Sequence, residues 1–70
     1  MNYRSILNMA SKELKENSIK SFLLDSEILL SKALNISREK VLINLEREIN
    51  ESQILKFIKI LEKRKKSEPI

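Results

Sequence analysis

The stretch SFLLDSEILLSKAL, residues 21–34, decides the fold of this 70-residue chain. Eight of its fourteen residues are apolar, and at about 3.6 residues per turn they cover most of a helix surface rather than one stripe. A helix of this kind has to be covered by other elements on more than one side. We therefore expect the rest of the chain to pack around a central helix at 21–34.

The segment before this helix carries a single apolar stripe at helical spacing, which predicts a helix over 3–17. The stripe consists of Tyr3, Ile6, Leu7, Ala10 and Leu14. Ser21 is placed as the N-cap of the central helix, so the connection is short and the two helices should run roughly antiparallel. After Leu34, Asn35 suits the left-handed conformation that ends many helices.

Two helix starts follow. Ser37 is placed as the N-cap of a short helix over 38–45, in which Val41, Leu42 and Leu45 should close one end of the core. Asn50, with Gln53 three residues later, forms a capping box that begins the last helix.

The last helix should run over 51–66, because Pro69 forbids its continuation. Its core face should carry four apolar residues, Ile54, Phe57, Ile58 and Leu61. A single turn at 46–48 is left open as a fifth helix. No Gly, one Pro and three aromatic residues argue against a sheet. The fold class is therefore all-α, a small bundle of four to five helices at about 3–17, 21–34, 38–45 and 51–66.

The composition excludes most chemistry. Without Cys or His a metal site is not expected, and without Gly no phosphate-cradling loop is expected. Asp25 and Glu27 are two residues apart, so on a helix they point in nearly opposite directions and cannot act as a catalytic pair. Asp25 should instead pair with a base, Arg38 or Arg64. We predict no catalytic, cofactor-binding or metal-binding residue in this chain.

The formal charge of +4 resides in the last helix, since residues 1–55 carry eight bases and eight acids. Lys and Arg side chains at a helix C-terminus interact favourably with the helix dipole. We prefer this explanation of the basic residues to a phosphate-binding patch. No apolar run is long enough to span a bilayer, and the N-terminus does not look like a signal peptide. We expect a cytoplasmic protein.

Three groups of residues carry a family resemblance in their order and spacing: DSEILL at 25–30, LNISR at 34–38, and Arg64 followed by SEPI at 67–70. They resemble the N-terminal domain of the bacterial release-factor glutamine methyltransferases, the HemK-type (PrmC) enzymes. That family shows an Asp-Ala-Glu-hydrophobic-Leu-Leu helix, a Leu-Gly-x-Ser-Arg turn and an Arg-rich helix end before Gly-Glu-Pro-Ile. The resemblance covers about residues 14–70. Ser26, Asn35 and Ser67 depart from the pattern.

By resemblance, one set of residues is structural or faces a partner: Asp25, Glu27, Leu29, Leu30, Arg38, Arg64, Glu68 and Pro69. A second set of exposed bases is expected to meet an acidic surface of the release factor: Arg38, Lys40, Arg47, Lys63 and Lys66.

The resemblance implies that residues 1–70 are a helical substrate-recognition domain and that the chain stops at a domain boundary. A Rossmann-like catalytic domain, absent from this chain, would bind S-adenosylmethionine. With an Asn-Pro-Pro-Tyr motif it would methylate the Gln of Gly-Gly-Gln in class 1 peptide chain release factors. The parent protein would be a protein-(glutamine-N5) methyltransferase, whereas this chain alone would not catalyse. Its expected partners are the release factor and its own catalytic domain, with no membrane and no nucleic acid, and we expect a monomer.

Two alternatives stay open. One is a free-standing nucleic-acid-binding module that uses 38–45 and 51–66 as a helix-turn-helix, although its charge lies at the wrong end of the last helix for base reading. The other is a protein-interaction or assembly bundle, which an oligomer in light scattering would indicate.

Overall fold

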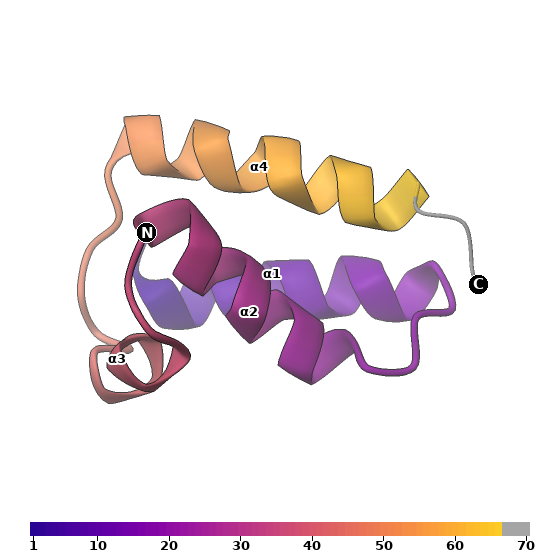
Figure 1. Cartoon of the computed structure of the whole chain (residues 1–70), viewed down its shortest axis with the longest axis horizontal. Coiled ribbons are helices and arrows are strands. Elements are labelled where there is room, and N and C mark those ends of the chain that lie inside the picture. Colours follow the sequence, from indigo (N-terminus) through magenta and orange to yellow (C-terminus); the bar gives the residue numbers. More distant parts are fainter. Residues whose placement is uncertain (67–70) are drawn as a thin grey trace.

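The structure, a computed structural model, describes residues 1–66. In this range the chain forms four helices: α1 (Tyr3–Glu16), α2 (Phe22–Leu34), α3 (Arg38–Ile43) and α4 (Glu51–Lys66). α1 and α2 run roughly antiparallel, α4 lies along both of them, and α3 lies at the end of the bundle where α4 begins (Figure 1). The predicted all-α bundle is confirmed.

α2 is the central element, because it contacts all three other helices. Its buried residues are Ser26, Leu30 and Ala33. The remaining core residues come from every other helix and from the connection before α4: Tyr3, Ile6, Leu7, Ala10, Leu14, Val41, Ile49, Phe57 and Leu61. The predicted stripe of α1 is thus buried in full.

Exposure of several apolar side chains departs from the prediction. Leu23 and Leu24, in the first turn of α2, are 61% and 45% exposed. Leu42, expected to close the core, and Ile58, expected on the core face of α4, are each 37% exposed. The reason is geometric: in a bundle this small each helix buries one narrow face, so apolar residues about 100° away from that face remain in water.

The helix ends follow local sequence rules. Asn35 adopts the left-handed conformation with φ 59° and ψ 42°, as predicted. Ser37 accepts the backbone N–H of Lys40 at 3.2 Å. In the capping box, the Gln53 N–H donates to Asn50 Oδ1 at 2.8 Å and the Asn50 N–H donates to Gln53 Oε1 at 3.1 Å. These three predictions are confirmed.

Ser21 occupies the predicted N-cap position of α2, but two details of the helix ends differ from expectation. Ser21 precedes α2 but makes no capping bond, because its Oγ donates to Asp25 Oδ2 at 3.1 Å instead. α1 ends at Glu16, one residue before the predicted end, and Ser18 takes a left-handed φ of 64° that was not predicted. There the Ile19 N–H donates to the Leu14 carbonyl at 3.0 Å, which is the bond that closes a Schellman motif.

The connection between α3 and α4 is not helical at 46–48, and α3 ends at Ile43 rather than at residue 45. The segment instead pairs with the N-terminus of the chain through a bridge between Asn2 and Glu48. The Tyr3 N–H donates to the Arg47 carbonyl, and the Arg4 N–H donates to the Leu45 carbonyl, each at 3.0 Å. These bonds satisfy the backbone groups that another helical turn would have used.

Candidate partner-binding surface

Asp25 and Arg64 form an ion pair that joins the start of α2 to the end of α4. Arg64 Nη2 lies 2.6 Å, and its Nε 2.9 Å, from the same Asp25 Oδ2. The pair is partly buried, with the Asp25 side chain 18% exposed and the Arg64 side chain 37% exposed. Of the two bases that the sequence offered for Asp25, Arg64 is the partner.

Arg38 pairs with Glu27, its Nε lying 2.8 Å from Oε1, and so joins the first residue of α3 to α2. Asp25 and Glu27 can serve different neighbours because residues two apart point to nearly opposite sides of a helix. Leu30 is fully buried, and Leu29 is partly buried against the core. Most of the family-motif residues in the described range therefore join the helices together. Glu68 and Pro69 lie outside that range.

Lys65 forms a third ion pair between helices, joining α4 to α1, which the sequence did not predict. Its Nζ lies 2.8 Å from Glu13 Oε1 in α1 and 3.1 Å from Glu62 Oε2 in its own helix. The hydrogen bond with Glu13 raises the pKa of Lys65, and the hydrogen bond with Glu62 raises it further by a smaller amount. The only local signal was the three-residue spacing of Glu62 and Lys65, since Glu13 is 52 residues away.

The Asp25–Arg64 pair gives a first prediction. In a double-mutant cycle of Asp25→Ala and Arg64→Ala, we expect a coupling energy of about 1 kcal/mol, because the contact is close but water reaches both partners. Urea unfolding of the wild type, both single variants and the double variant, followed by circular dichroism, measures it. Strictly additive losses would show that the pair contributes nothing to stability.

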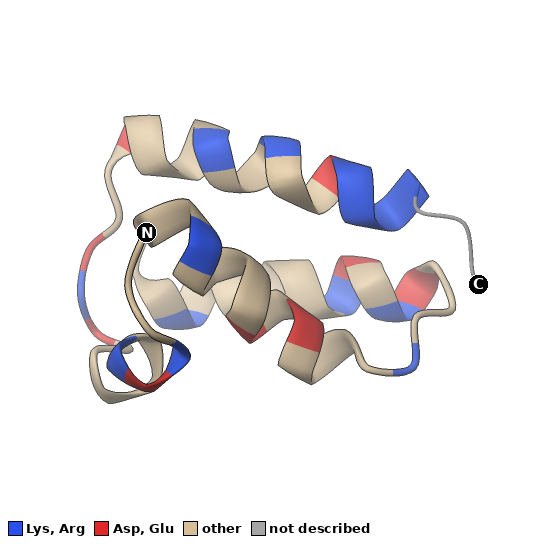
Figure 2. Cartoon of the chain, viewed as in Figure 1, with Lys and Arg blue, Asp and Glu red and all other residues tan. Residues whose placement is uncertain are grey.

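The bases of α4 divide into two groups. Arg64 and Lys65 are engaged in ion pairs, whereas Lys63 and Lys66 are exposed. Lys56 and Lys59 are exposed on the same side of the helix as Lys63 and Lys66, away from the core, because the four recur at spacings of three and four. Figure 2 shows how the positive charge gathers toward the end of this helix.

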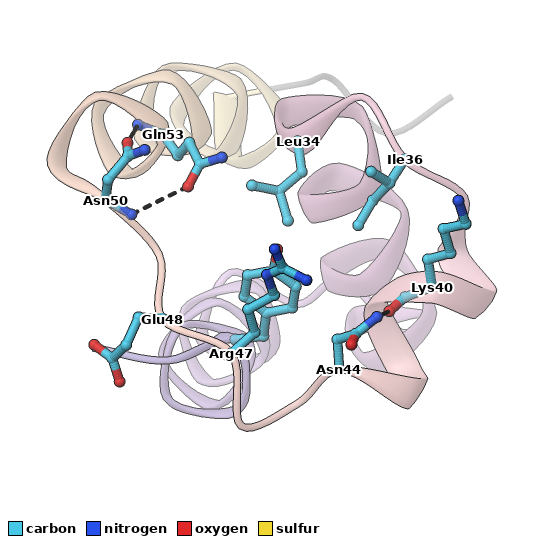
Figure 3. A pocket seen from close by; sticks show the side chains of 9 residues that line it. Leu34, Ile36, Lys40, Asn44, Arg47, Glu48, Asn50 and Gln53 are labelled. Carbon is cyan, nitrogen blue, oxygen red and sulfur yellow. Dashed lines mark hydrogen bonds between the residues drawn. The ribbon is translucent and has the colours of Figure 1, made fainter.

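Lys40 and Arg47 line a common groove, although they belong to different elements. The groove, of about 450 Å³, lies between the end of α2, α3, the 44–50 connection and the first turn of α4 (Figure 3). Its lining residues are Tyr3, Leu34, Ile36, Lys40, Asn44, Arg47, Glu48, Asn50 and Gln53. Two of the predicted partner-facing bases are thus brought together, while Lys63 and Lys66 lie toward the far end of α4.

The acidic side chains of the described residues are spread over the surface or engaged in ion pairs. Within residues 1–66, no group of three or more His, Cys, Asp or Glu side chains is placed to hold a metal ion. The carboxylate of the groove, Glu48, is engaged by the amino group of Met1 at 3.2 Å. None of the helices in this part of the chain is both long and apolar enough to cross a bilayer.

Comparison with known proteins identifies relatives of the chain. It is 42% identical over 67 residues to a bifunctional methyltransferase of Rickettsia felis, a match that covers 96% of this chain and 13% of the relative. It is 35% identical over 65 residues to a release factor glutamine methyltransferase of Leptospira interrogans, covering 93% of this chain and 23% of the relative. The chain therefore spans less than a quarter of the length of either protein.

No solved structure shows significant similarity to the chain. The family model of the PrmC N-terminal domain matches residues 5–70, which is nearly the whole sequence. This match includes the Asp25–Arg64 and Glu27–Arg38 pairs that join the helices. The chain belongs to the PrmC N-terminal domain family.

Proposed function

We propose that this chain is the release-factor-binding domain of an S-adenosylmethionine-dependent methyltransferase. The substrate would be the Gln side chain of the Gly-Gly-Gln motif in class 1 peptide chain release factors. The observation that supports this most directly is the family match over residues 5–70, together with a relative named release factor glutamine methyltransferase. The chain would hold the release factor while a separate catalytic domain carries out methyl transfer during the maturation of factors for translation termination.

The residues of this chain do not fit S-adenosylmethionine itself. The sequence has no Gly for a backbone cradle, and Glu48, the carboxylate that lines the groove with Lys40 and Arg47, already binds the amino terminus. The methyl donor would therefore be bound by the catalytic domain, and this chain would contribute binding alone. We place the protein in the cytoplasm, where release factors act, as a monomer.

Binding of the chain to a purified class 1 release factor tests the proposal. We expect a saturable complex in isothermal titration calorimetry and no affinity for random duplex DNA in a gel-shift assay at physiological salt. Affinity for the DNA without affinity for the release factor would favour the nucleic-acid-binding alternative. An oligomer of the chain in light scattering, with no binding of either ligand, would favour an assembly module.

The exposed bases at the end of α4 give a second prediction. Reversing Lys63 and Lys66 to Glu should slow association with the release factor about tenfold at low salt, because exposed charges act mainly on encounter rates. Stopped-flow association at increasing ionic strength measures the effect, which salt should reduce. Lys12→Glu/Lys20→Glu is the control, because it changes the net charge by the same amount. Association that does not respond to salt would remove this role.

A further inference from the structure

We infer that the groove containing Lys40 and Arg47 binds an acidic segment of the release factor, with a carboxylate of that segment lying between the two bases. This inference rests on the proposed function, because it takes the release factor as the protein that supplies the segment. It goes further by naming the site and the chemistry that it recognises.

The groove presents an excess of hydrogen-bond donors. Neither Lys40 nor Arg47 takes part in an ion pair within residues 1–66. Asn50 and Gln53 accept hydrogen bonds through their side-chain oxygens, so the capping box leaves the NH₂ groups of both side chains available to donate. Two cations and two amide groups therefore line the groove, so an anionic ligand with several acceptors suits it best.

Glu48, the carboxylate that lines the groove, does not pair with Lys40 or Arg47. Glu48 is engaged by the Met1 amino group, and in Figure 3 its side chain points away from the middle of the groove, whereas that of Arg47 lies near its centre. Repulsion of an incoming carboxylate is therefore weak, and the attraction to Lys40 and Arg47 dominates.

Arg47 is held in place by its backbone. The Arg47 N–H donates to the Asn44 carbonyl at 2.9 Å, and the Arg47 carbonyl accepts from the Tyr3 N–H at 3.0 Å. The next residues are fixed as well, since the Ile49 N–H donates to the Met1 carbonyl at 2.9 Å. A base on such an anchored loop loses less backbone freedom on binding than one on a mobile loop.

A protein segment fits the groove better than a nucleic acid does. Two cations are few for a phosphate backbone, whose binding usually involves many contacts. The walls also include the apolar side chains of Leu34 and Ile36, and Asn44 uses its NH₂ group toward the Lys40 carbonyl, which leaves its Oδ1 free to accept a peptide N–H. Acidic, apolar and peptide groups occur together in a polypeptide.

The groove is also remote from the end of α4. It lies at the first turn of that helix, and Lys66 is roughly 20 Å further along the helix axis, from the rise of an α-helix. The groove and the exposed bases at the end of α4 are therefore two separate surfaces.

The double variant Lys40→Ala/Arg47→Ala tests the inference, with Lys12→Ala/Lys20→Ala as a control that removes the same charge from exposed sites outside the groove. We expect the groove variant to bind the release factor about tenfold more weakly and the control to bind within about twofold of wild type, as charge-assisted hydrogen bonds are lost only in the former. Calorimetry measures affinity, and circular dichroism checks that both variants are folded.

A second arm maps the site. The ¹⁵N-labelled chain is titrated with a blocked peptide of alternating Glu and Ala, and the amide signals of Asn44, Arg47 and Gln53 should shift first. If the release factor binds wild type and both double variants equally, the groove is not its site, while the proposed function stands. If the release factor does not bind wild type, both proposals fail, and peptide shifts would then show only that the groove accepts carboxylates.

Discussion

Phe57→Ala is expected to lower the free energy of unfolding by about 3–5 kcal/mol, the usual cost of removing a fully buried aromatic side chain. Phe57 is 0% exposed and is the largest of the fully buried side chains, contributed by the helix that closes the bundle. A chain of 70 residues has a total stability of roughly 4–10 kcal/mol. The variant should therefore lose at least about a third of the total stability, and nearly all of it where the wild type lies at the lower end of this range.

Thermal and urea unfolding followed by circular dichroism measure this loss. The neighbouring substitution Ile58→Ala is the control, because Ile58 is 37% exposed on the same helix and should cost less than about 1.5 kcal/mol. Equal losses for the two variants would contradict the orientation of α4, since they would place Ile58 as deep in the core as Phe57.

Leu30→Ala should cost about 2–5 kcal/mol, the second-largest effect that we expect. Leu30 is 0% exposed and lies on α2, the helix that contacts the other three. The loss of stability has two parts. The first is the free energy of transferring the removed apolar atoms from water to the core, and the second is the cost of the cavity that the small core cannot fully close.

Leu23→Ala is a matched control for this change, because it removes the same atoms from the same helix at a position that is 61% exposed. It should cost less than about 1 kcal/mol, and both replacements introduce the residue with the highest helix propensity. The difference between the two variants in urea unfolding then reports burial alone. A loss at Leu23 that equals the loss at Leu30 would mean that the first turn of α2 is covered in solution.

The elements that local sequence determines were predictable. The capping box at Asn50 and Gln53 fixed the start of α4, and Asn35 fixed the end of α2, because both depend on side chains within a few residues. The 46–48 segment was not predictable in this way. Its conformation depends on pairing with Asn2, more than forty residues earlier, which no local propensity encodes.

In the candidate site, too, local features were predictable and long-range contacts were not. Lys40 and Arg47 could be named from charge and expected exposure, but their convergence on one groove depends on the path of the 44–50 connection. The pairing of Asp25 with Arg64 rather than Arg38 likewise needed the packing of α4 on α2. For Lys65 and Glu13 no signal existed, since each looks like an ordinary surface residue of its own helix.

The two ion pairs at the end of α4 have a mechanical consequence. The last turn of an isolated helix frays readily, but here Arg64 is bound to α2 and Lys65 to α1. A pull or twist applied at this end of the helix would therefore be passed to both other long helices at once.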